Sequence, residues 1–206
     1  MFPTLPVHMG LVVRNLRSTL LRGCDLSVAD GEIVTLRGAS GAGKSVLLRA
    51  IADMDPNEGD VWLDDVSRAS LSGPEWRRRV RYVAAESAWW EDDVAPHFRF
   101  PDQSRPLAVE LGMPDDFLSW QVARLSTGEK QRLAFVRALE DNPRALLLDE
   151  PTAALDSEAE RLVEARISRL QAAGTAIILV THSDAQAERL AAHRYLVEGG
   201  LLRETV

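Results

Sequence analysis

The stretch Gly38-Ala39-Ser40-Gly41-Ala42-Gly43-Lys44-Ser45 decides the fold class of this 206-residue chain. An apolar run, 33–37, precedes it and an amphipathic stretch, 44–52, follows, so we expect a strand, a glycine-rich loop and a helix in succession. The glycines let backbone N–H groups curl around phosphates, and the helix N-terminus adds partial positive charge. Lys44 would reach the β- and γ-phosphates, and Ser45 would supply a Mg²⁺ ligand. The pattern therefore predicts a nucleotide-binding loop rather than an ordinary glycine-rich turn.

The rest of the chain alternates short apolar runs with amphipathic stretches. This alternation predicts an α/β fold with a P-loop core, a mostly parallel sheet and an antiparallel edge sheet near the N-terminus. We expect strands at 11–13, 24–28, 33–37, 61–63, 81–84, 145–149, 176–181 and 195–197. Helices are expected at 44–52, 128–140, 158–172 and 184–191, the third opening with Asp156 and Ser157 as caps.

One segment interrupts the α/β pattern. Residues 86–125 contain three tryptophans, no long strand and four prolines, at positions 96, 101, 106 and 114. We expect this segment to form a small, unusually short helical subdomain. Residues 1–85 and 126–206 would then form the catalytic core of a single domain, which is an ordinary size for an α/β protein.

Charge and composition exclude several classes of protein. The formal net charge of −7 argues against a general nucleic-acid coat, which needs a basic field. Cys24 is the single cysteine, so no internal disulfide forms, and its apolar neighbours predict a buried thiol. The sequence contains no apolar run of about 18 residues and no signal-peptide pattern at its start. We therefore expect a cytoplasmic protein.

Two adjacent carboxylates end the apolar run 145–149. Asp149 and Glu150 would lie at the carboxyl edge of the sheet, where open α/β sheets place their ligands. Asp149 would hold Mg²⁺ through water, and Glu150 would orient and deprotonate the water that attacks the γ-phosphate. A strand that ends in acidic turn residues is common, so the interpretation depends on the phosphate loop.

The segment Leu125-Ser126-Thr127-Gly128-Glu129-Lys130-Gln131-Arg132 directly precedes the apolar face of a helix. Ser126, Thr127 and Gly128 would offer a hydroxyl and backbone N–H groups as a second anion site. Taken alone, the segment is typical of a capped helix start. Its position between the phosphate loop and the carboxylate pair favours the functional interpretation.

These three motifs follow one another as they do in the ATPase subunits of ABC transporters, which the chain resembles over nearly its whole length. The segment 125–132 is the most specific of them, because other phosphate-loop ATPases lack it. Residues 153–156 and 180–182 are similar to that family's D-loop and switch histidine.

The resemblance implies an ATP- and Mg²⁺-dependent ATPase that works as a head-to-tail homodimer. ATP bound at Lys44 and Ser45 of one chain would be covered by Ser126 and Gly128 of the other. His182 would contact the γ-phosphate, and Asp156 would couple the two sites. The resemblance further implies a separately encoded integral membrane permease, through which the chain would associate with the membrane, and no nucleic-acid partner.

Two positions depart from the family's pattern. The family carries an aromatic residue before the phosphate loop that stacks on adenine, yet 15–25 contains none, so Phe2 or a partner's side chain would have to replace it. The family's Q-loop glutamine matches Ala85. Either the ATPase is slow or Glu86, one residue later, completes the metal shell.

The tryptophans have two interpretations. Trp89 and Trp90 lie in the segment that the family places against the permease, so they would either form a partner-binding patch or fill the subdomain core. Trp62 and Trp76 are expected in the main core.

Several narrower functions remain open. Among compact relatives, the chain most resembles the ATPase of a bacterial two-component system thought to export iron. The haem-export ATPase of cytochrome c maturation and lipoprotein- or amino-acid-type ATPases are alternatives. A nucleotide-sensing module with little turnover is a further alternative, because the adenine aromatic and the Q-loop glutamine are missing. DNA-repair and translation cassettes fit less well, because they carry coiled coils or paired cassettes.

Overall fold

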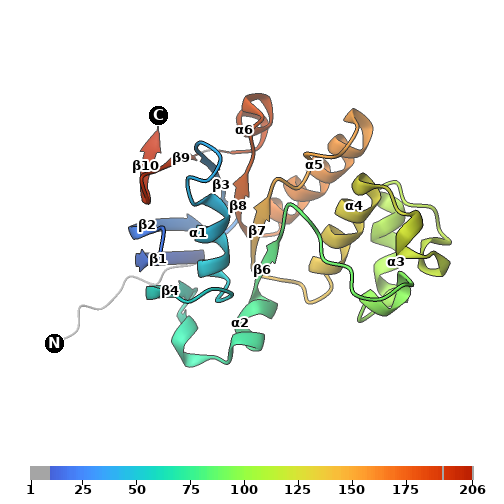
Figure 1. Cartoon of the computed structure of the whole chain (residues 1–206), viewed down its shortest axis with the longest axis horizontal. Helices are drawn as coiled ribbons and strands as arrows, with labels where there is room; N and C mark the ends of the chain where they lie inside the picture. Colours follow the sequence, from blue (N-terminus) through green and yellow to red (C-terminus); the bar gives the residue numbers. More distant parts are fainter. Residues whose placement is uncertain (1–9, 192, 206) are drawn as a thin grey trace.

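Two β-sheets with helices between and around them make up the computed structural model, which describes residues 10–191 and 193–205 (Figure 1). The larger sheet contains, in spatial order, β10 (Leu201–Thr205), β9 (His193–Glu198), β3 (Ile33–Arg37), β8 (Ala176–Val180), β7 (Ala145–Asp149) and β6 (Val80–Val83). Only β10 runs antiparallel to its neighbour; the other five strands are parallel. The observed sheet confirms the expected mostly parallel core.

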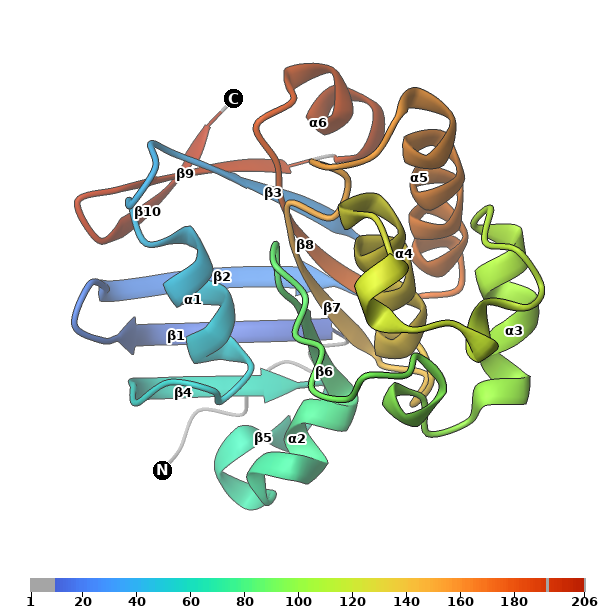
Figure 2. The same ribbon diagram turned by 45° about the vertical axis from the view of Figure 1, so that its right-hand side comes forward.

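The smaller sheet is antiparallel and is built from strands near the N-terminus of the sequence. Its strands are β2 (Arg22–Ala29), β1 (Gly10–Arg17), β4 (Glu58–Leu63) and β5 (Val66–Ser67), in that spatial order. Buried and exposed side chains alternate along β2, as expected when one face of an antiparallel sheet is solvated. Helix α1 (Lys44–Ile51) lies against the buried face (Figure 2). Leu47 and Ile51 of α1 pack into one core with both sheets.

A second core covers the opposite face of the larger sheet. Helices α4 (Thr127–Ala138) and α5 (Ser157–Ala172) supply Phe135 and Val163 to it. Successive residues of β7 alternate between the cores: Leu147 belongs to the first, whereas Leu146 and Leu148 belong to the second. Every residue of β7 is buried, because helices cover both faces of a parallel sheet.

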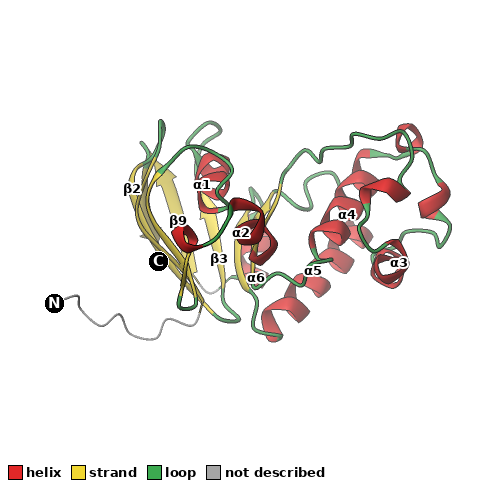
Figure 3. Cartoon of the chain, turned by 90° about the horizontal axis from the view of Figure 1, so that it is seen from below, coloured by secondary structure: helices red, strands yellow, loops and turns green. Residues whose placement is uncertain are grey.

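The segment between β6 and α4 is mainly helical. It contains α3 (Pro101–Glu110) and short 3₁₀ turns at Ala95–His97, Phe117–Ser119 and Val122–Arg124. These elements lie at the end of the molecule away from the smaller sheet (Figure 3). Phe98 and Phe117 meet edge to face, with ring centroids 5.7 Å apart. The structure thus has the expected helical insertion; the exact division at residues 86 and 125 stays a prediction.

The expected elements are present, with ends that differ by a few residues, and four further elements had no predicted range of their own. These are β5, β10, α3 and α2 (Gly73–Arg79). Helix α6 (Asp184–Leu190) completes the fold. No helix in the described part of the chain is long and apolar enough to span a membrane.

Two of the expected core residues differ in burial. Trp76 is fully buried, and its indole N–H donates to the carbonyl of Ile51 at 2.9 Å. Trp62 is only half-buried, because it lies on β4 between the inward-facing Val61 and Leu63. The prediction that Trp62 fills the core was therefore wrong. The Cys24 thiol is buried, as expected.

Candidate nucleotide-binding and catalytic site

The glycine-rich loop joins the end of β3 to the start of α1. Gly43 adopts a left-handed conformation, with φ of 104°, directly before the helix. A Cβ on Gly38 would lie 2.4 Å from the carbonyl oxygen of Val197 in β9, so only glycine fits there. The Lys44 side chain donates from Nζ to the carbonyl oxygens of Gly38 and Ala39, at 2.8 and 3.1 Å. These contacts hold the ammonium group inside the curve of the loop.

A pocket of about 260 Å³ opens beside this loop. The ends of four strands, β3, β6, β7 and β8, and the β1–β2 turn supply its lining residues: Leu20, Ser40, Gly41, Gly43, Lys44, Ser45, Val46, Ala85, Asp149, Glu150, Val180 and His182. Strands β3, β7 and β8 are parallel neighbours, so the residues that follow them meet at one edge of the sheet. The structure thereby brings together the loop, the two carboxylates and the histidine from widely separated parts of the sequence.

Asp149 is almost fully buried at the end of β7. Its Oδ2 accepts a hydrogen bond of 2.9 Å from the phenol of Tyr82 on the neighbouring strand β6. Burial raises the pKa of Tyr82, and the negative charge of Asp149 raises it further. The phenol therefore stays protonated and keeps donating to Asp149. Such an outer-shell donor fixes the orientation of a ligating carboxylate.

Glu150 has an uncommon backbone conformation for a non-glycine residue. Its φ is 51°, and its amide donates to the carbonyl of Val180 at 3.0 Å. Nε2 of His182 lies 3.1 Å from Oε1 of Glu150. Among the described residues, this buried oxygen has no well-aligned hydrogen-bond partner, which leaves it free to accept a proton from water. Burial raises the pKa of Glu150; His182 opposes the shift and Asp149 adds to it.

The second anion site begins α4, outside the pocket. Ser126 caps the helix: its Oγ accepts from the Glu129 amide at 3.2 Å, and the Glu129 carboxylate accepts from the Ser126 amide at 2.8 Å. The side chains of Ser126 and Thr127 are exposed. Gly128 packs tightly, because a Cβ there would lie 2.9 Å from the carbonyl oxygen of Ala154. Within one chain, the structure does not bring this segment to Lys44.

Asp156 also lies outside the pocket. Its carboxylate caps α5 by accepting from the amides of Ala159 and Glu158 at 2.9 and 3.0 Å, as the sequence predicted. These bonds, the one from Ala159 above all, lower the pKa of Asp156. Its carboxylate is therefore ionised at neutral pH and available at the surface.

Two of the three predicted metal ligands line the same pocket. Ser45 and Asp149 offer the hard oxygen donors that Mg²⁺ prefers, together with nucleotide phosphates. Glu86 lines a neighbouring groove instead, and Ala85 faces the pocket. The described residues contain no cluster of three or more His, Cys, Asp or Glu side chains suited to a metal ion. The structure thus does not bring Glu86 to the other predicted ligands.

Comparison with known proteins places this site in a family. The family model described as "ABC transporter" matches residues 21–153. The chain belongs to the ABC transporter family. It is 36% identical to the aliphatic sulfonates import ATP-binding protein of Pseudomonas fluorescens (strain Pf0-1), over 96% of this chain and 77% of that protein. It is 35% identical to the ATP-dependent lipid A-core flippase of Chromobacterium violaceum, over 80% of this chain but 31% of the flippase.

Solved structures agree with this assignment. An ATP-binding subunit of an ABC transporter matches with a TM-score of 0.87 and 26% identity, covering 96% of this chain and 90% of its own. A dimeric ATP-binding cassette in a post-hydrolysis state, bound to ADP and Pi, matches with a TM-score of 0.78 and 23% identity, covering 95% and 97%. The chain is accordingly an ABC ATPase with an ABC cassette fold.

The pocket of this cassette lacks an aromatic residue among its described lining side chains. Leu20, in the turn between β1 and β2, is 51% exposed and lines the pocket beside the loop. The sequence did not indicate Leu20, because the expected side chain at this position was aromatic. Phe2, the other candidate, lies outside the described residues. Sequence reasoning also missed Tyr82, whose only signal is its place next to the strand that carries Asp149.

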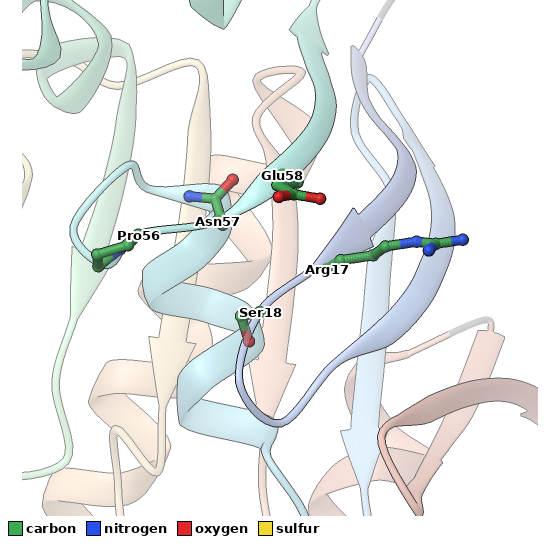
Figure 4. A pocket seen from close by; sticks show the side chains of 5 residues that line it. All are labelled: Arg17, Ser18, Pro56, Asn57 and Glu58. Carbon is green, nitrogen blue, oxygen red and sulfur yellow. The ribbon is translucent and has the colours of Figure 1, made fainter.

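A second pocket, of about 420 Å³, lies where the same β1–β2 turn approaches the start of β4 (Figure 4). Its lining residues are Arg17, Ser18, Pro56, Asn57 and Glu58. The Arg17 side chain extends away from Pro56 and Asn57. None of the predicted site residues lines this pocket, and it has no part in the assignments made for the cassette.

The raised pKa of Glu150 predicts that Glu150→Gln stabilises the folded chain at neutral pH. Because the pKa lies above the ordinary value of 4.5, the folded state disfavours the ionised carboxylate. This penalty is absent below pH 4.5, grows as the pH rises, and is complete above the folded-state pKa. Thermal unfolding should therefore give a higher Tm for Glu150→Gln at pH 8, and the gain should shrink towards pH 4.5. The exposed Glu188→Gln serves as the control, and an equal gain there would contradict the explanation.

Proposed function

We propose that this ABC ATPase dimerises head to tail around ATP and Mg²⁺ to drive a separately encoded membrane permease. One observation carries the proposal: Lys44 and Glu150 line one pocket, whereas the exposed start of α4, with Ser126 and Gly128, points elsewhere. A chain with one of its two phosphate-binding segments outside its own pocket needs a second chain to complete the site.

Within the pocket, the roles follow from position and chemistry. The loop amides and Lys44 would bind the phosphates. Glu150 would take a proton from the attacking water, since its pKa is raised and its Oε1 has no well-aligned hydrogen-bond partner among the described residues. Ser45 and Asp149 would hold Mg²⁺, which would neutralise charge on the phosphates. His182, next to Glu150, would contact the γ-phosphate.

The head-to-tail arrangement is supported by the surface position of the second anion site. Ser126 caps α4, a helix of twelve residues. The free N–H groups at the start of α4, and the positive end of its dipole, therefore face outward. Asp156 is exposed near the same region and would couple the two sites. The dimeric cassette bound to ADP and Pi has this fold, although its 23% identity carries only the fold to this chain.

A groove of about 320 Å³ between the core and the helical subdomain suits the permease. Two exposed apolar side chains line or border it, Met54 (52% exposed) and Trp90 (63% exposed). The guanidinium of Arg137 lies 5.0 Å from the Trp90 ring and fixes its position. Trp89 is half-buried and packs against the subdomain core. Each of the two interpretations of this pair therefore applies to one tryptophan: Trp89 packs in the subdomain core, and Trp90 would contact the permease.

The direction of transport is inferred from the relatives of the chain, because the site itself does not indicate it. The Pseudomonas fluorescens protein named for aliphatic sulfonates import matches 96% of this chain, whereas the flippase matches 80%. This difference supports import, and none of the relatives described above is named for iron or haem export. The permease forms the pathway, so the transported substrate does not follow from the cassette.

The first test is steady-state ATPase activity as a function of protein concentration. A composite site requires two chains, so we expect the rate to rise faster than linearly. Glu150→Gln should lower kcat by on the order of 10²-fold or more, because it removes the general base. A rate proportional to concentration would contradict dimerisation. If the chain binds ATP but its ATPase activity does not exceed that of Glu150→Gln, the nucleotide-sensing alternative would be favoured.

Ala85 and Glu86 give a matched pair for the metal site. Ala85→Gln introduces the family's amide into the pocket and should lower the Mg²⁺ concentration for half-maximal ATPase activity, by on the order of tenfold. Glu86→Ala should leave that concentration unchanged, because Glu86 lines the groove. Titration of both variants with Mg²⁺ checks this. A higher Mg²⁺ requirement in Glu86→Ala would identify Glu86 as a ligand.

Trp90→Ala should weaken binding to the permease without changing the ATPase activity of the isolated chain. Truncating a central aromatic anchor of an interface costs about 2 kcal/mol or more, which is roughly a 30-fold loss of affinity. Binding to the permease in detergent or vesicles measures the effect. Val109→Ala is the control, because Val109 is 44% exposed on α3 and does not line the groove. Equal losses in both variants would argue against the groove.

A further inference from the structure

The Gln131 side chain connects α4 to the turn that follows Glu150. It is nearly fully buried, with 5% exposed, although glutamine is usually a surface residue. Its Nε2 donates to the backbone carbonyl of Glu150 at 2.6 Å, and its Oε1 accepts from the backbone amide of Ala154 at 3.2 Å. The donor and the acceptor of the side-chain amide are therefore both hydrogen-bonded, the first to the start of the turn and the second to its end.

The turn that Gln131 spans contains the strained backbone of Glu150. A non-glycine residue with φ of 51° persists only where its surroundings determine the conformation. The Glu150 amide is held by Val180, and its carbonyl also accepts from the Ala153 amide at a longer 3.3 Å. Gln131 thus supplies the shortest hydrogen bond to the peptide group that orients the Glu150 carboxylate.

A second buried glutamine holds the same turn from α6. Nε2 of Gln186 donates to Oγ1 of Thr152 at 2.9 Å and to Oε1 of Glu164 at 3.0 Å. Gln186 contacts a side chain of the turn, whereas Gln131 contacts the backbone of Glu150 itself. The position of Glu150 therefore depends more directly on α4 than on α6.

Helix α4 also presents Ser126 and Gly128 at its exposed start. Gly128 lies against the same turn, since a Cβ added there would lie 2.9 Å from the carbonyl oxygen of Ala154. A movement of the helix start would consequently reach Glu150 through Gln131 and Ala154. In the proposed dimer, that start covers the nucleotide held by the partner chain.

We propose that Gln131 is a positioning residue that couples the nucleotide covered by the start of α4 to the general base Glu150 of the same chain. The inference rests on the proposed head-to-tail dimer. Gln131 does not line the nucleotide pocket; it holds the backbone from which the Glu150 carboxylate projects. Loss of its hydrogen bonds would displace the base while leaving Lys44 and Ser126 in place.

The test compares kcat with ATP binding in Gln131→Met, which keeps the length of the side chain and removes both hydrogen bonds. Misplacing a reacting group by about 1 Å costs on the order of 10²-fold in rate, so kcat should fall by about 10- to 100-fold. KM for ATP should stay within about twofold. ATP-dependent dimerisation, followed by sedimentation in the Glu150→Gln background, should also be unchanged.

Two further variants separate positioning from loss of stability. Val136→Ala truncates a buried residue of the same helix without touching the turn, so it should reduce stability while retaining kcat. Gln131→Glu keeps an acceptor for Ala154 but places a carboxylate against the Glu150 carbonyl, so its kcat should fall as in Gln131→Met. Wild-type kcat in Gln131→Glu would overturn the role of the donor bond.

The remaining outcomes are equally distinct. A kcat within about threefold of wild type in Gln131→Met, or a fall in kcat matched by equal losses in ATP binding and dimerisation, would overturn the proposal. An equal fall of kcat in Val136→Ala would do the same. If the wild-type chain itself lacks turnover that depends on Glu150, the proposed function fails rather than the role of Gln131.

Discussion

Parallel pairing joins β3 to β8 and β8 to β7. Each group assigned to ATP chemistry within one chain lies at the end of one of these strands or directly after it. Parallel strands end at a common edge, so the loop, the carboxylate pair and the histidine meet without any local sequence relation. The apolar side chains of these strands are buried on both faces, which fixes their order and register. The position of the site therefore follows from the packing of the sheet.

The same arrangement has a cost in stability. Glu150 combines an uncommon backbone conformation with a buried carboxylate of raised pKa, and Asp149 lies beside it. A base suited to neutral pH needs this environment, whereas a stable fold would avoid it. Tyr82 donates a hydrogen bond to Asp149, Gln131 donates to the Glu150 carbonyl, and the Glu150 amide donates to the Val180 carbonyl; these bonds offset part of the cost.

Motifs with a local mechanism could be predicted from the sequence. The phosphate loop, the strand before Asp149 and the caps at Ser126 and Asp156 depend on neighbouring residues, and all lie where expected. Helical structure was expected in the segment 86–125, but the position of helix α3 was not, because Pro106 lies inside this helix and proline disfavours a helix interior. The packing of α3 on the subdomain core offsets the lost hydrogen bond.

Contacts between distant residues could not be predicted from the sequence. Tyr82 and Asp149 are 67 residues apart and meet only because β6 pairs with β7. Gln131 appeared in the sequence as part of a helix-start motif, and nothing local indicated its bond to Glu150. The different surroundings of Ala85 and Glu86 are likewise a property of the folded loop, since adjacent residues there face separate cavities.

The contact of Gly38 with β9 has a consequence for the order in which the protein is made. The phosphate loop is translated early, yet its wall at Val197 and both sheet neighbours of β3 come from the last third of the chain. Synthesis proceeds at about 5–20 residues per second, so the loop waits for the strands that support it. A nascent chain therefore carries the complete phosphate-loop sequence long before it has a binding site, and it acquires that site only after β8 and β9 have been made.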